Sequence, residues 1–178
     1  MLTDDARRLL VELARFAVRA RVGGKRVALS PRSAFPAASG VFVTLKIDGE
    51  LRGCLGTLES EDLGHDVARC AADAASDDPR FPPVAAFELS LLTVDVSVLG
   101  PLERIDPHDA DAFAIGQHGL VVEDGDRRGL LLPQVASERR WTRVQFLRQT
   151  CLKAGLRVDA WQSGATVYRF TADVFGDA

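Results

Sequence analysis

Residues 41–47, Val-Phe-Val-Thr-Leu-Lys-Ile, are followed by Asp48-Gly49 and then by residues 51–58, Leu-Arg-Gly-Cys-Leu-Gly-Thr-Leu. In the first segment, strongly apolar side chains recur at every second position, which is the period of a half-buried strand. Asp-Gly between two such segments is a strong signal for a tight hairpin turn. We therefore predict a β-hairpin over residues 41–58, around which the rest of the fold is built.

The flanking segments show helical and strand periods without a regular alternation between them. Helices are predicted over 4–21, 62–76, 107–115 and 138–154, and strands over 89–99, 119–123, 129–132 and 165–174. A second hairpin turn is predicted at Asp124-Gly125. A doubly wound parallel sheet would require strict alternation, so we predict an α+β fold with mixed or antiparallel sheets and hairpins packed by helices. Residues 1–178 are expected to form a single domain, either one compact unit or two intertwined α+β lobes.

The composition is that of a globular protein. Apolar residues make up 47% and charged residues 26% of the 178 positions, so a substantial core can form. The 22 basic and 25 acidic residues leave a net charge of −3, which argues against a nucleic-acid binder. Basic residues do gather locally, and we interpret that group as a solvated helix face with its exit loop: Arg15, Arg19, Arg21, Lys25 and Arg26.

The three cysteines, Cys54, Cys70 and Cys151, are widely spaced, so neither a disulfide framework nor a zinc site is predicted. Cys70 and Cys151 fall on apolar helix faces and are expected in the core. The acidic N-terminus lacks the pattern of a signal peptide, and no apolar segment is long enough to cross a bilayer. We therefore expect a cytoplasmic protein that contacts no membrane and holds no metal or cofactor.

The segment Arg52-Gly-Cys-Leu-Gly-Thr57 belongs to an ordered set of motifs. The others are Asp78-Pro-Arg-Phe81 with Pro83-Val84, Glu88-Leu89 leading to Val96-Ser-Val-Leu99, Gly116 to Leu120, Gly129-Leu-Leu-Leu-Pro-Gln134, Glu138 before Trp141, and Cys151-Leu-Lys-Ala-Gly155. In this set the chain resembles the AMMECR domain family, whose signature is Arg-Gly-Cys-aliphatic-Gly-Thr on a strand. The resemblance covers roughly residues 5–175, and an ordered set is more specific than a lone motif. Leu55 replaces the commoner isoleucine, which leaves the chemistry of the segment intact.

The resemblance implies a two-lobed α+β protein and no particular reaction. The chain is similar to the stand-alone domains of the protein A group of the AmmeMemoRadiSam system, in which the domain accompanies a Memo-like protein and a radical-SAM protein. This context implies a role in a modification system or its assembly. A Memo-like or radical-SAM protein would then be a separate partner.

Cys54 is the candidate nucleophile of the motif. A thiol must become a thiolate to attack, and a nearby cation favours that form. Side chains two residues apart on a strand share a face, so we expect Arg52 to reach toward the sulfur. Alternatively, Cys54 is a buried cysteine that packs as a small hydrophobe. Packing or non-covalent binding is favoured over catalysis.

The glycines of the motif have two interpretations. Gly53 and Gly56 can mark a close approach in which exposed backbone N–H groups hold a carboxylate or phosphate, with Thr57 adding a hydroxyl. They can also simply let a neighbouring element pack closely. Arg80 likewise either clamps an anionic ligand or pairs with Asp78 in the loop that ends the preceding helix.

His118 lies in the turn Gly116-Gln-His-Gly119, where its side chain can enter a cleft, and Gln134 either lines the same cleft or caps the turn after it. A nucleophilic cysteine needs such a base, although nothing in the sequence pairs His118 with Cys54. We rank a module that binds a small anionic ligand or a partner first. A Cys54-dependent enzyme of acyl or thiol transfer comes second, and a nucleic-acid binder third.

Overall fold

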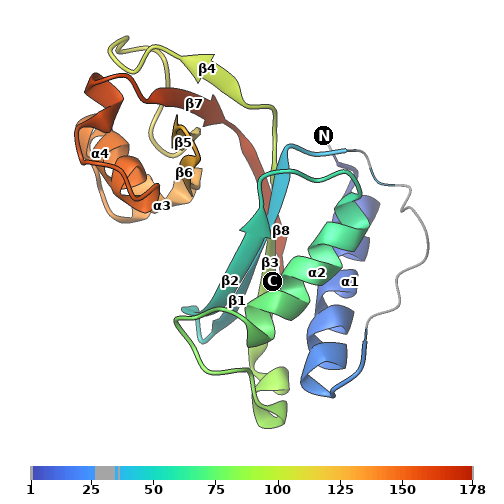
Figure 1. Ribbon diagram of the computed structural model, residues 1–178. Helices are drawn as coiled ribbons and strands as arrows, with labels where there is room; N and C mark the ends of the chain where they lie inside the picture. Colours follow the sequence, from blue (N-terminus) through green and yellow to red (C-terminus); the bar gives the residue numbers. More distant parts are fainter. Residues whose placement is uncertain (1, 27–34, 36, 178) are drawn as a thin grey trace. The chain divides into compact units, whose positions relative to one another are not determined.

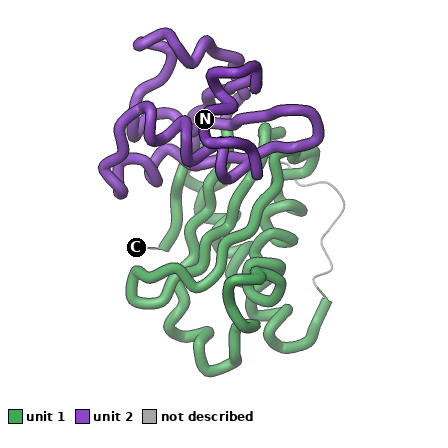
Figure 2. Tube along the Cα trace, turned by 60° about the vertical axis from the view of Figure 1, so that its left-hand side comes forward, with its two compact units in different colours: residues 1–99, 173–178 green, residues 100–172 purple. Residues whose placement is uncertain are grey.

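The computed structural model describes residues 2–26, 35 and 37–177. The chain divides into two compact units, Met1–Leu99 with Asp173–Ala178, and Gly100–Ala172 (Figure 2). We call them unit 1 and unit 2 and describe each by itself.

Unit 1 consists of a four-stranded sheet with two helices on one face. Its elements are α1 (Asp4–Val22), β1 (Gly40–Ile47), β2 (Glu50–Thr57), α2 (Leu63–Ser76), the 3-10 helix η1 (Ala86–Ser90), β3 (Leu92–Leu99) and β8 (Ala172–Gly176). The strand order is β2-β1-β3-β8, which leaves β2 at one edge. Helices α1 and α2 lie side by side across the sheet (Figure 1).

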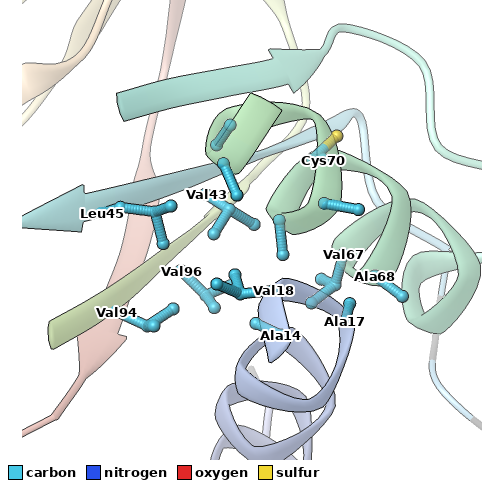
Figure 3. Packing of buried hydrophobic residues seen from close by; sticks show 14 of the residues in the cluster. Ala14, Ala17, Val18, Val43, Leu45, Val67, Ala68, Cys70, Val94 and Val96 are labelled. Carbon is cyan, nitrogen blue, oxygen red and sulfur yellow. The ribbon is translucent and has the colours of Figure 1, made fainter. Parts of the chain in front are cut away.

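The core of unit 1 forms between the sheet and these helices, and Figure 3 shows part of it. The labelled residues are Ala14, Ala17, Val18, Val43, Leu45, Val67, Ala68, Cys70, Val94 and Val96. The helix starts follow from local capping, because the side chains of Thr3 and Asp62 accept hydrogen bonds from the backbone N–H groups of Ala6 and His65. The predicted helices over 4–21 and 62–76 are therefore confirmed to within about a residue at each end.

Unit 2 contains the second sheet. Its elements are β4 (Glu103–Ile105), β5 (Gly119–Asp124), β6 (Arg127–Leu131), α3 (Pro133–Glu138), α4 (Arg143–Lys153), the 3-10 helix η2 (Ala160–Gln162) and β7 (Thr166–Phe170), with strand order β4-β7-β5-β6. The β1–β2, β1–β3, β4–β7, β5–β6 and β5–β7 pairs are antiparallel. The α+β class and both predicted hairpins are confirmed.

Two predicted helices are wrong in part or in full. Residues 107–115 form turns, because the carboxylates of Asp106 and Asp109 accept bonds from the backbone N–H groups two residues further on and compete with helical bonds. Of the helix predicted over 138–154, residues 143–153 form α4, because the separate helix α3 already ends at Glu138. Arg140 has a φ of 52°, and Thr142 begins α4 through a capping box with Gln145.

Two predicted strands also need correction. Residues 89–91 lie outside β3, because 86–90 form η1. The strand predicted over 165–174 is divided at Thr171 into β7 and β8, which belong to different sheets. The sequence also predicts a loop from Ser30 to Gly40, with prolines at 31 and 36, and most of this range falls outside the described residues. In the part of the chain that is described, no helix is both long and apolar enough to cross a membrane.

Candidate functional site

Strand β2 carries the signature segment, and an irregularity in its pairing determines where the side chains point. Leu45 pairs with Gly53 but Lys46 pairs with Leu51, so Arg52 is an extra residue opposite β1. Such a bulge breaks the two-residue alternation and re-aims a side chain. The prediction that Arg52 reaches toward the Cys54 sulfur assumed a regular strand, and in the structure the guanidinium donates to Glu88.

The Arg52 guanidinium forms a closed set of contacts with η1 and the loop before it. It donates to both carboxylate oxygens of Glu88, at 2.7 and 2.9 Å, and to the carbonyls of Pro82 and Pro83, at 3.0 and 3.4 Å. The two charged side chains are only 14% and 15% exposed. Glu88 also accepts a bond from the backbone N–H of Ala85. Arg52 thus ties the edge strand to η1.

Asp78 and Arg80 cap the outer edge of β2 at Cys54. The backbone N–H of Cys54 donates to Asp78 Oδ2 at 2.9 Å, and Arg80 Nη2 donates to the carbonyl of Cys54 at 3.3 Å. Arg80 also donates from Nε and Nη2 to the two Asp78 oxygens, at 2.9 and 2.7 Å. The backbone N–H of Cys54 therefore already binds a carboxylate, and that carboxylate is the side chain of Asp78 in the same chain. Satisfying both backbone groups of an edge residue also prevents pairing with another strand there.

Both glycines of the motif lie where a side chain would collide with a neighbour. A Cβ on Gly53 would lie 2.2 Å from the carbonyl oxygen of Ala74 on α2, so the absence of a side chain lets α2 pack closely on β2. A Cβ on Gly56 would lie 2.3 Å from the ring of Phe42, the residue opposite it on β1. Close packing therefore accounts for both glycines, and an additional ligand contact at either one stays a prediction.

Cys54 faces away from the helices, since its neighbour Gly53 faces α2. On that face it pairs directly across from Thr44, whose hydroxyl donates to the sulfur at 3.3 Å, and Thr44 in turn pairs with Asp95 on β3. The Cys54 side chain is half-buried, so it is not sealed in the core. Cys70 and Cys151 are buried, as predicted.

The electrostatics of the site are those of two tightly held ion pairs. The pKa of Asp78 lies well below its ordinary value, mainly because Arg80 donates hydrogen bonds to it, and the pKa of Arg80 is raised by the same pair. Hydrogen bonds from Arg52 likewise lower the pKa of Glu88. Burial raises the pKa of the Cys70 thiol to about 11, which makes that cysteine unreactive.

The AMMECR1 family model matches residues 11–175. The chain belongs to the AMMECR1 family. A relative from Methanosarcina acetivorans is 44% identical and covers 98% of this chain and 93% of its own length, and one from Thermococcus kodakarensis is 45% identical with 97% and 90% covered. The crystal structure of the uncharacterised protein PH0010 from Pyrococcus horikoshii aligns with a TM-score of 0.88 at 40% identity, over 99% of this chain and 93% of that one.

The other predicted site residues of this AMMECR1 domain have local contacts. Thr57 donates to the carbonyl of Glu59 within its own turn. In unit 2, the Nδ1 atom of His118 accepts a bond from the N–H of Ala114, and the carbonyl of Gln134 accepts one from Ser137. These contacts stabilise turns, and the ligand roles of the three residues stay predictions. Among the described residues, no group of three or more His, Cys, Asp or Glu side chains is arranged to hold a metal ion.

Two residues of this AMMECR1 site were missed at the sequence level. Glu88 lies in a family-like segment, but nothing local indicates that it pairs with Arg52, which is 36 residues away. Thr44 lies on the polar face of the first predicted strand, and only the register of the hairpin shows that it lies opposite Cys54. Counting outward from the Asp48-Gly49 turn could have indicated the Thr44–Cys54 pair, had the bulge at Arg52 been foreseen.

Proposed function

We propose that this AMMECR1 chain is a binding module that holds a small anion against the exposed side of the Arg80 guanidinium, beside Cys54. The observation that carries the proposal is the contrast within one ion pair. The Asp78 side chain is 2% exposed, whereas that of Arg80 is 50% exposed. Asp78 therefore fixes the orientation of a cation that still meets solvent.

A guanidinium held in this way is prepared for an anion. Asp78 and the Cys54 carbonyl engage Nε and Nη2, and among the described residues no hydrogen bond engages Nη1. A carboxylate or phosphate oxygen can bind there without the cost of ordering the arginine. Asp78 partly neutralises the cation, so two charge-assisted hydrogen bonds of roughly 2 kcal/mol each give a Kd of about 1 mM.

The alkylation rate of Cys54 provides the assay, because Cys54 is half-buried whereas Cys70 and Cys151 are buried. We expect citrate or inorganic phosphate to slow its alkylation by iodoacetamide with a saturable dependence on concentration. Sodium chloride at equal ionic strength serves as the control. In an Arg80→Lys variant, which keeps the charge but loses the planar fork, the protection should shift to several-fold higher anion concentration. Equal protection by chloride, or none by either anion, contradicts the proposal.

A Cys54-dependent enzyme of acyl or thiol transfer is the second candidate. One observation favours it: the Thr44 hydroxyl lies 3.3 Å from the sulfur and donates a hydrogen bond to it. If the thiol is a nucleophile, its alkylation should remain fast well below pH 8.5, the ordinary thiol pKa. A rate that follows an ordinary thiol rules out the enzyme and leaves the binding module intact.

We also propose that η1 contacts a protein partner. Phe87 is 77% exposed and directly precedes Glu88, which Arg52 holds. A large exposed aromatic on a fixed backbone is a typical anchor for a protein partner. We propose a Memo-like or radical-SAM protein as that partner. Phe87→Ser should weaken binding to the purified partner at least about tenfold, whereas Phe16→Ser on α1 should not. Equal effects, or none, contradict this assignment.

A further inference from the structure

Unit 1 contains a hollow of about 500 Å³ between the end of α1 and helix α2. It is lined by Arg21, Gly24, Lys25, Arg26, His65, Ala68, Arg69 and Ala72. No acidic residue is among these eight, so the fully charged groups that line the hollow are all cationic. Three of the five basic residues that the sequence groups between 15 and 26 thus line a cavity instead of forming only a solvated face.

Two of the cations are held in place from behind. Arg21 Nη2 lies 3.0 Å from Asp73 Oδ1, and Arg69 Nη1 lies 3.8 Å from Asp73 Oδ2, so one carboxylate brings together arginines from two helices. Arg21 also pairs with Asp77 at 2.7 Å, and Arg69 with Asp66 at 2.9 Å. Both arginines remain partly exposed. Their orientation is therefore largely set before any ligand arrives.

Lys25 and Arg26 enter from the turn that ends α1. The N–H of Lys25 donates to the carbonyl of Ala20 at 2.8 Å, and Gly24 has a φ of 69°, which together fold the chain back at the helix end. Both side chains are exposed, and neither has a hydrogen bond or ion pair with another described residue. The hollow is lined by four cationic side chains, and three aspartates pair with Arg21 and Arg69. The local net charge is therefore +1, in a chain whose net charge is −3.

The floor of the hollow is apolar. Ala68 and Ala72 lie four residues apart and therefore on the same face of α2, and they are only 1% and 4% exposed, so the hollow ends on the apolar core. The volume lies within the range of about 300–1,000 Å³ typical of small-molecule sites. A ligand that fits combines a multiply charged anionic group with a less polar organic part.

We infer that this hollow binds a small phosphorylated organic molecule. A phosphate group carries up to two charges and three terminal oxygens, so it can accept bidentate bonds from a guanidinium and a further bond from a lysine, which a single carboxylate cannot match. This site uses the end of α1 and helix α2, whereas Cys54 and Arg80 belong to β2 and its edge. The two proposals therefore stand or fall separately.

Calorimetric titration of the full chain tests the inference, with AMP and inorganic pyrophosphate as probes. We expect saturable binding of AMP with a Kd below about 1 mM. A Lys25→Glu/Arg26→Glu double variant should weaken binding at least about tenfold, because two cations become anions at the rim. Both side chains are exposed, so the melting temperature should not change. Arg8→Glu, which reverses one exposed cation at the other end of α1, is the control for a charge reversal outside the hollow and should leave the Kd unchanged within about twofold.

Each contrary result overturns the inference. Absence of saturable binding of either probe removes the site. Equal weakening by Arg8→Glu shows that general charge, not the hollow, attracts the probe. A single-stranded RNA that binds more tightly than AMP and loses affinity in the double variant identifies a nucleic-acid surface instead. Cys54 alkylation, measured in parallel, should be unaffected by the double variant.

Discussion

Replacement of Arg52 by methionine removes the guanidinium and keeps most of the side chain's length, and we expect it to destabilise unit 1. Four hydrogen bonds are lost, two to the Glu88 carboxylate and two to the carbonyls of Pro82 and Pro83. Glu88 is left as a mostly buried charge without its partner. Breaking a buried ion pair costs about 3–5 kcal/mol, and the partial exposure of this pair places the loss near the lower limit, at about 3 kcal/mol.

The assay is urea unfolding followed by circular dichroism, with a thermal scan beside it. For a chain of 178 residues each 1 kcal/mol corresponds to roughly 2–4 °C, so the melting temperature should fall by roughly 6–12 °C. A double-mutant cycle with Glu88→Gln isolates the pair, and its coupling energy should reach at least about 1.5 kcal/mol. Arg157→Met, at a highly exposed ion pair with Asp159, is the control and should unfold like the wild type.

A single result refutes this reasoning. If Arg52→Met unfolds within about 0.5 kcal/mol of the wild type, the contact with Glu88 contributes little to the fold. Arg52 would then be available to a ligand, as the sequence motif suggests. The proposal at Arg80 would have to be extended to include it.

Three further predictions concern the same region. Gly53→Ala should destabilise by about 1–3 kcal/mol in urea unfolding, because its Cβ would overlap the backbone of α2, and unchanged stability would show that the two elements can move apart. Because arginine hydrogen bonds lower the pKa of both Asp78 and Glu88 in the folded state, the unfolded chain binds protons first as the pH falls below about 4. Stability should therefore drop there, and Asp78→Asn should reduce that slope; an equal slope would argue against the pair. In mass spectrometry of the native protein, iodoacetamide should modify Cys54 before Cys70, whose pKa burial raises to about 11, and the reverse order would contradict the described burial.

Elements that depend on neighbouring residues were predictable. The Asp48-Gly49 turn forms with φ values of 51° and 81°, as its composition indicates. Helix α1 begins at the Thr3 cap and ends at Gly23-Gly24, because capping and glycine geometry act within a turn. The helix predicted over 107–115 failed for an equally local reason, since the carboxylates of Asp106 and Asp109 accept bonds from nearby N–H groups and form turns instead.

The contacts of the candidate site needed the tertiary structure. The motif suggested Arg52 as the cation beside Cys54, but the bulge turns Arg52 toward Glu88 and leaves Arg80 at the Cys54 backbone. The assignment of β7 and β8 to different sheets could not be predicted either, because the alternation of apolar residues over 165–174 does not show which sheet each part joins.

The sequence by itself determined the family, the α+β class and the place of the signature strand, because periodicity, turn chemistry and ordered motifs are properties of the chain. Only the tertiary structure decided which charges meet. The Cys54–Asp78 and Arg52–Glu88 bonds span 24 and 36 residues, and both depend on strand register and helix packing. The hollow between α1 and α2 exists for the same reason, since its cations come from segments that only the folded core brings together.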